Sequence, residues 1–317
     1  MLFRSSASPK STFAGSSAGS SAVNAADAKA KMKYLNFPAR SVGDLQIYLF
    51  RAETFDFGAK YLAKANGRVA VPVDSECGLV VNYDGAQDLS FWNQLPPGSL
   101  VVLVANNFEI GDEQMLALNH LEKLKVLEMS STEIGNPTFA HLKSCTNLVE
   151  LVTPSCLVTG AGLASLKDLT ALRRLAIDHN DFDDASMVNL KGLTNLLSVR
   201  LQACKIGDSG FANLKRCDRI YDLNIGQNKN ITDNCLPTLL ALKKLRHLDL
   251  TDTSVTIVGL RQLVHLPKLS KLTVSFERIK ASQIAELKLL LPNCSIENGR
   301  RARVPIEVFE PITKKSH

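Results

Sequence analysis

A repeat solenoid of the α/β class is the fold that this sequence predicts, with a curved parallel sheet on its inner side and short helices on its outer side. The pattern L-x-x-L-x-L-x-x-[T/N/C]-x-[I/V/F] recurs eight times, at intervals of 24 residues with one interval of 25. A fixed period of about 20–29 residues indicates units that stack and bury a continuous core. The eight copies begin at Leu100, Leu124, Leu148, Leu172, Leu196, Ile220, Leu245 and Leu269.

The leucines of one copy predict a short strand followed by a turn. Leu172, Leu175 and Ile177 alternate with polar or small residues, as the buried face of a strand does. Asn180 follows where the chain must turn, and a small polar side chain there can satisfy backbone groups of the turn. The same column of the other central copies holds Thr132, Cys156, Cys204, Asn228 and Thr253.

The second half of the copy predicts a short outer helix. Asp183 and Asp184 can cap a helix over residues 185–190, in which Met187 and Leu190 have helical spacing. The corresponding segments of three other copies are Ile134-Gly-Asn-Pro-Thr-Phe139, Ile206-Gly-Asp-Ser-Gly-Phe211 and Ile231-Thr-Asp-Asn-Cys-Leu236. They resemble the I-[TG]-D-x-G-L segment of the bacterial leucine-rich-repeat family, which is similar to the repeat arrays of F-box proteins. The resemblance covers about 200 of the 317 residues and implies a leucine-rich-repeat solenoid.

Four domains are expected along the chain. Residues 1–33, rich in Ser, Ala and Gly, are expected to form a disordered tail, although an organelle transit peptide or an export signal in residues 1–30 stays open. Residues 34–75 are expected to form a small β-rich module that caps the first repeat. Residues 76–296 form the solenoid, with one degenerate copy (Leu79, Val81 and Asp84) before the eight clear ones. Residues 297–317 provide a C-terminal cap and a basic tail.

The ends of the array carry their own signals. The module at 34–75 resembles the N-terminal part of some bacterial repeat proteins, through Phe37, Pro38, Arg40, Ser41, Gly43, Leu45, Gly67, Val69, Val71 and Pro72. It lacks the Leu-Pro-rich helical start of an F-box. At the other end, residues 284–291 predict the last outer helix and residues 291–296 a final edge strand. The segment Val304–Phe309 is expected to pack onto that end.

Charge and cysteine content limit the partners. The net charge is +6, and residues 1–33 and 297–317 supply +4 and +2 of it, so the body is neutral. A neutral body disfavours a nucleic-acid groove. The sequence contains no run of 18 apolar residues, so no membrane-spanning helix is expected. Seven cysteines without a C-x-x-C pair are typical of buried thiols in a reducing compartment rather than of zinc ligands. We therefore expect a cytoplasmic monomer that binds no nucleic acid, membrane, metal or cofactor.

The third, fifth and seventh positions of each copy point away from the core and define a concave strip. Its N-terminal part is apolar and its later part mixes both signs of charge, as an interaction site can. Two other interpretations stay open: residues 34–75 or the tail fold over the valines, and the polar part is a solvated face with cross-strand ion pairs. The expected protein-binding residues are Val102, Val104, Val126, Val152, Arg174, Asp178, Arg200, Gln202, Asp222, Asn224, His247 and Asp249.

Three functions compete. A scaffold without enzymatic activity, which binds a protein or peptide on the concave strip, is the function that the fold favours. The alternative is a substrate-recognition subunit of a ubiquitin-ligase-type assembly, an analogy of fold alone. An enzyme is disfavoured, because the reactive-looking segment Asp178–Asp181 belongs to a strand exit and a turn, and no catalytic or phosphate-binding motif occurs. No catalytic residue is therefore expected.

Overall fold

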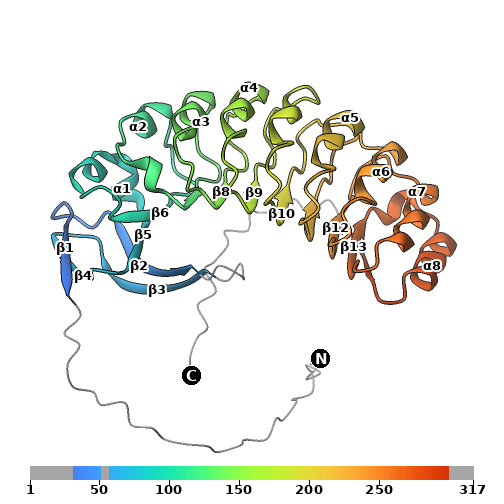
Figure 1. Cartoon of the computed structure of the whole chain (residues 1–317), viewed down its shortest axis with the longest axis horizontal. Helices are drawn as coiled ribbons and strands as arrows, with labels where there is room; N and C mark the ends of the chain where they lie inside the picture. Colours follow the sequence, from blue (N-terminus) through green and yellow to red (C-terminus); the bar gives the residue numbers. More distant parts are fainter. Residues whose placement is uncertain (1–30, 51–56, 300–317) are drawn as a thin grey trace, which may run out of the picture. The chain divides into compact units, whose positions relative to one another are not determined.

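Twelve strands lie side by side in one sheet in the part of the chain that the computed structural model describes, residues 31–50 and 57–299 (Figure 1). The order across the sheet is β14-β13-β12-β11-β10-β9-β8-β7-β6-β5-β2-β3, and β1 pairs with β4 in a separate two-stranded sheet. The strands are β1 (Met32–Asn36), β2 (Gly43–Phe50), β3 (Phe57–Lys64), β4 (Arg68–Pro72), β5 (Glu76–Val81), β6 (Leu100–Val104), β7 (Val126–Glu128), β8 (Glu150–Val152), β9 (Arg174–Ala176), β10 (Ser198–Arg200), β11 (Asp222–Asn224), β12 (His247–Asp249), β13 (Lys271–Val274) and β14 (Ser295–Asn298).

Short helices follow the strands on the outer side of the array. The α-helices are α1 (Tyr83–Gln87), α2 (Asp112–Leu116), α3 (Asn136–Leu142), α4 (Gly160–Leu163), α5 (Asp208–Phe211), α6 (Leu236–Leu239), α7 (Ile257–Gln262) and α8 (Ala281–Leu290). The 3-10 helices are η1 (Ser90–Gln94), η2 (Leu121–Lys123), η3 (Ala164–Leu166), η4 (Ser186–Leu190), η5 (Ala212–Leu214), η6 (Asp233–Cys235), η7 (Leu263–His265) and η8 (Phe276–Arg278). Within the unit that begins at Met32, the sheet is the inner layer and these helices are the outer layer (Figure 1).

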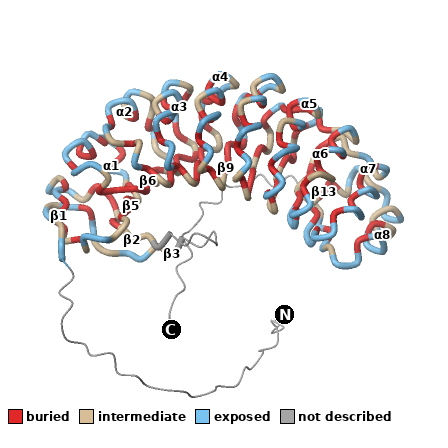
Figure 2. The backbone as a smooth tube through the Cα atoms, in the orientation of Figure 1, coloured by how far each residue is buried: buried red, intermediate tan, exposed pale blue. Residues whose placement is uncertain are grey.

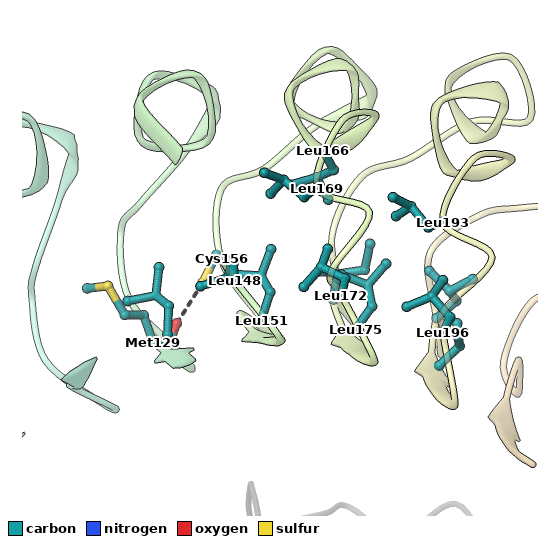
Figure 3. Close-up of a cluster of buried hydrophobic side chains, with 14 of the residues drawn as sticks. Met129, Leu148, Leu151, Cys156, Leu166, Leu169, Leu172, Leu175, Leu193 and Leu196 are labelled. Carbon is teal, nitrogen blue, oxygen red and sulfur yellow. Dashed lines mark hydrogen bonds between the residues drawn. The ribbon is translucent and has the colours of Figure 1, made fainter. Parts of the chain in front are cut away.

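The strand register confirms the predicted repeat. From β5 to β14 the strands pair in parallel, and Leu127, Leu151 and Leu175 are direct neighbours although they are 24 residues apart in the chain. Leu151 and Leu175, with Leu148 and Leu172 at the first position of their copies, lie between the sheet and the helices (Figure 3). Figure 2 shows this buried layer running along the whole array. One core cluster therefore extends from Leu35 to Ile296.

The polar turn column does what its residue types predict. The side-chain amide of Asn228 donates to the carbonyls of Leu201, Ile225 and Gly226 at 2.7–3.1 Å. Asn180 donates in the same way to three carbonyls of its own turn and of the preceding copy. Buried backbone carbonyls need such partners, because leaving one unsatisfied costs about 1–3 kcal/mol. Small polar side chains in this column therefore hold neighbouring turns together.

In the first seven copies, the residue at one corresponding position of the turn after the strand has a left-handed backbone, with a φ between 52° and 62°. This conformation recurs because the chain leaves the strand at a similar angle in these copies. The seven residues are Asn107, Ser131, Ser155, His179, Ala203, Gln227 and Asp252.

Of the two side chains predicted to cap the helix over residues 185–190, only one bonds to that helix. Asp183 accepts from the backbone N–H of Ser186, the first residue of η4, at 2.8 Å, as a capping side chain does. Asp184 instead accepts from the N–H of Gly207 in the next copy at 2.5 Å. Corresponding side chains at Asp208 and Asp233 also accept from the next copy, at 2.9 and 2.8 Å. The capping residue and the residue that joins successive copies are therefore different side chains.

The N-terminal strands cover the first end of the array. β2 pairs antiparallel with β5 and with β3, and β5 pairs in parallel with β6, with Leu79 opposite Leu103. Asp84, which the sequence predicted in the turn column of the degenerate copy, lies inside α1; the Asn82 side chain takes the polar role at this turn, because it accepts from Gly85 N at 2.9 Å. The first strand begins at Met32, two residues before the expected boundary at 34, because Met32 pairs with Pro72.

At the C-terminal end, α8 begins three residues before the predicted helix, and β14 begins at Ser295 rather than at residue 291. β14 pairs in parallel with β13 as a ninth strand of the repeat type would. Residues 1–30 and 300–317, which include most of the predicted N-terminal tail (1–33) and the Val304–Phe309 segment, lie outside the described residues.

Candidate functional site

The strand backbones carry the expected binding residues to one side of the sheet. Side chains alternate along a strand, so the core leucines face the helices and the third, fifth and seventh positions face the concave side. The twelve expected residues differ in exposure. Val102, Val126, Val152 and Asp178 are buried, His247 is exposed, and the other seven are half-buried.

The apolar end of the concave strip is covered by β2. The Tyr48 ring packs against a cluster made by Val101, Val102 and Val126, with Val104 at its margin. This answers one of the questions that the sequence left open, because the N-terminal strands cover these valines.

Gly78 of β5 makes that contact feasible. A Cβ atom at Gly78 would lie 2.5 Å from both the Tyr48 ring and the Cβ of Val102, closer than real side chains approach. The missing side chain therefore lets the Tyr48 ring reach the valines.

Three ionisable side chains lie next to this cluster. Burial raises the pKa of Tyr48, and the nearby Glu128 and Glu150 carboxylates raise it further. Burial also raises the pKa of Glu128. It raises the pKa of Glu150 to about 7, while the Arg174 guanidinium opposes that shift. The N-terminal end of the strip is therefore an environment in which negative charge is poorly solvated.

A buried ion pair joins β8 to β9. Arg174 Nη1 lies 2.5 Å from Glu150 Oε1, and the exposed fractions of the two side chains are 20% and 2%. The carboxylate is thus beneath the surface and the guanidinium lies above it. A buried pair of this kind holds the arginine in place, because separating it would leave a charge without a partner in the core.

The same arrangement recurs one strand further along. Arg200 Nε lies 3.4 Å from Asp178 Oδ2, and the Asp178 side chain is only 6% exposed. Asp178 also accepts from the backbone N–H of Gln202 at 2.9 Å. Burial is the largest influence on the pKa of Asp178 and raises it, whereas the Arg200 charge lowers it.

The polar network continues to the C-terminal half of the strip. His247 Nδ1 lies 3.7 Å from Asp222 Oδ1, and Ser198 Oγ donates to the other Asp222 oxygen at 2.7 Å. Asn224 donates to Gln202 Oε1 at 3.1 Å. The polar part of the strip is therefore a cross-strand ladder, which was one of the two interpretations that the sequence left open.

The segment Asp178–Asp181, which looks reactive in the sequence, is occupied by structural contacts. Of the segment Asp178–Asp181, Asp178 pairs with Arg200, His179 is the exposed left-handed turn residue, and Asn180 is buried in its turn. Among residues 31–50 and 57–299, no three His, Cys, Asp or Glu side chains come together as metal ligands would. The described helices are also all too short or too polar to cross a bilayer.

Sequence reasoning missed three members of this site. Glu128 and Glu150 occupy outward columns, and their position next to valines could have indicated poorly solvated carboxylates. Tyr48 gave no comparable signal, because its place over the valines depends on how β2 pairs with β5. A side chain brought in by an antiparallel neighbour cannot be read from the repeat pattern.

Comparisons with known proteins bear on the fold. No model of a known protein family matches the sequence, and no curated protein is similar enough to count as a match. Among solved structures, the internalin InlF of Listeria monocytogenes has a TM-score of 0.51 and 20% identity, over 64% of this chain and 55% of the internalin. Internalin C2 of the same organism has a TM-score of 0.44 and 23% identity, over 63% of this chain and 81% of that one.

The chain thus spans little more than half of the InlF chain. At this level of identity the likeness concerns the fold alone. Together with the parallel register from β5 to β14, it shows that the chain forms a leucine-rich-repeat solenoid with an N-terminal cap.

Proposed function

We propose that this protein is a scaffold without enzymatic activity that binds a protein or a peptide on the concave strip between β9 and β12. The observation that carries the proposal is the ladder of buried carboxylates beneath half-buried arginines, Glu150 beneath Arg174 and Asp178 beneath Arg200. Arginines held in this way lose little side-chain entropy when a partner binds. Arginine is also favoured among the residues that dominate binding energy.

The cysteines support the proposed cytoplasmic location. All seven are unpaired, and six of them are buried. Cys156 and Cys204 donate from the turn column to backbone carbonyls, so their thiols serve as small polar groups of the interior. Unpaired structural thiols fit a reducing compartment. We further propose that the protein is a monomer. We also propose that it has no nucleic-acid partner, because the neutral body offers no basic groove.

The experiment compares how well two double variants of the full-length chain retain a protein or peptide that the wild-type chain captures. Gln202→Ala with His247→Ala alters the concave strip without leaving a buried charge unpaired, since Gln202 is half-buried and His247 is exposed. Lys167→Ala with Lys191→Ala changes exposed residues on the outer side and is the control. Arg174 and Arg200 are poor probes, because truncating either strands a buried carboxylate and costs about 3–5 kcal/mol.

We expect the concave pair to weaken retention of the captured protein by about 5–30-fold, equivalent to about 1–2 kcal/mol. The outer pair should retain it as the wild type does, and both variants should keep the wild-type melting curve. Loss of capture by the outer pair alone would place the binding surface on the helices and overturn the proposal.

A further inference from the structure

We propose that residues 300–317 bind in cis along the concave strip, running from β12 toward Tyr48, and so compete with a partner for the same face. Three independent observations support this occupant: the direction in which the described chain ends, the charges on the strip, and the distance between its two ends.

The described chain ends over the strip. The backbone N–H of Gly299 donates to the carbonyl of Val274 at 3.0 Å, which continues the pairing of β14 with β13. A Cβ atom at Gly299 would lie 1.8 Å from Thr251 Oγ1. Thr251 belongs to the copy that contains β12, two strands in from the edge strand β14. Gly299, the last described residue, therefore lies against Thr251 rather than at the outer edge of the sheet.

The charges of the strip complement those of the segment. Residues 300–317 contain five basic residues and two acidic ones, which gives +3. Among the described residues of the strip, the carboxylates that take part in no ion pair are Glu128 and Asp249. Asp249 accepts from the N–H of Thr251 at 2.8 Å, so it lies close to the point where Gly299 packs. The described chain therefore ends near a carboxylate that has no ion-pair partner among the described residues, and Arg300 and Arg301 follow next in the sequence.

The distance between Asp249 and Glu128 on the strip matches the spacing between the basic and the apolar residues of the segment. Asp249 on β12 and Glu128 on β7 are five strands apart, which is about 24 Å at the usual spacing of about 4.8 Å. An extended chain covers this in about seven or eight residues. That places Val308 and Phe309 at the apolar end, where Val104 and Tyr48 border the valine cluster. The basic start and the apolar middle of the segment thus meet a carboxylate and an apolar surface in the same order.

Photo-crosslinking of the full-length chain tests the proposal. Phe309 is replaced with p-benzoylphenylalanine, and the crosslinked peptides of the monomer are mapped by mass spectrometry at two protein concentrations. We expect intramolecular crosslinks to Tyr48 or to the segments 101–104 and 126–128, with a yield independent of concentration. Crosslinks only to the outer helices, crosslinks only between two copies, or no intramolecular crosslink would each overturn the proposal.

A charge test uses two matched pairs of substitutions in the crosslinking chain. Glu128→Gln with Asp249→Asn should lower the intramolecular yield at least threefold, and added salt should lower it in the wild type. The control, Asp168→Asn with Asp218→Asn, removes two exposed carboxylates from the outer side and should leave the yield unchanged. Equal yields in both pairs would contradict the role assigned to the strip. No partner is needed, so failure here leaves the proposed partner binding untouched, and failure to capture a partner leaves this test intact.

Discussion

At the scale of single residues, the left-handed turn is the place where the side chain conflicts most with the backbone. Ala203 has a φ of 53°, a conformation that costs an alanine about 1–2 kcal/mol. We expect Ala203→Gly to raise the free energy of unfolding by about 0.5–1 kcal/mol, because glycine adopts this conformation without a Cβ clash. Urea denaturation measures the change. Ala212→Gly, at an exposed residue with a φ of −56°, is the control and should destabilise. Equal destabilisation by both would contradict the argument.

The buried carboxylate of Glu150 predicts a pH dependence. Burial raises its pKa to about 7 in the folded protein, above the value of about 4.3 of an unfolded chain. The folded state then binds the proton more tightly, so this group favours folding most at low pH and loses that contribution as the pH rises from about 4.3 to about 7.

Glu150→Gln keeps an acceptor for Arg174 and removes the titration. We therefore expect the variant to gain stability relative to the wild type between pH 5 and pH 8, by up to about 3 kcal/mol. Chemical denaturation of both proteins at the two pH values measures the difference. A relative loss by the variant would mean that the ion pair outweighs the cost of burying the charge.

Residue types predicted the direction of the side chains but not their pairing. Alternation along each strand correctly placed Arg174 and Asp178 on the side away from the core leucines. It gave no information on which carboxylate each arginine meets, because that depends on side-chain rotamers on neighbouring strands. The burial of Asp178 beneath Arg200 follows from such a choice.

At the scale of elements, each central strand places a middle core residue fully inside the array. Leu175 and Leu223 are 0% and 1% exposed. We expect Leu175→Ala or Leu223→Ala to cost about 2–5 kcal/mol, because each removes packed methyl groups and leaves a cavity. Thermal melting should fall by several degrees for both. The exposed Leu289 of α8, 82% exposed, provides the control, since Leu289→Ala removes little packing. Unchanged melting of both core variants would mean that the strand register is wrong.

The repeats could be predicted from the sequence because the same pattern recurs in all copies. A copy that departs from the pattern at one position can therefore be aligned with the others. The N-terminal strands occur only once, and their pairing follows no period. β2 could have joined β5 in several registers, and the observed one brings Tyr48 onto the valines. Short outer helices were also hard to bound, because Asp184 could have capped its own helix but bonds to the next copy instead.

At the scale of the whole molecule, the array behaves as neighbouring units that share one core. Each copy contacts mainly the copies beside it, so stability accumulates along the array and its ends need covers. Leu35 of β1 belongs to the same cluster as Ile296 of β14. The N-terminal strands are therefore part of the folded unit, although they lie outside the repeat pattern.

The final prediction concerns where that unit begins. Leu35 is 0% and Phe37 is 7% exposed, and the Phe37 ring lies 6.3 Å from that of Phe91. Removing residues 1–31 takes away none of these contacts, so we expect the melting temperature to stay within about a degree of the full-length value. Removing residues 1–37 deletes β1 and two buried apolar side chains, whose burial contributes about 3–6 kcal/mol. Melting should then fall by several degrees. An equal loss from both truncations would show that stabilising contacts begin before Met32, and loss from neither would show that β1 contributes nothing to the cap.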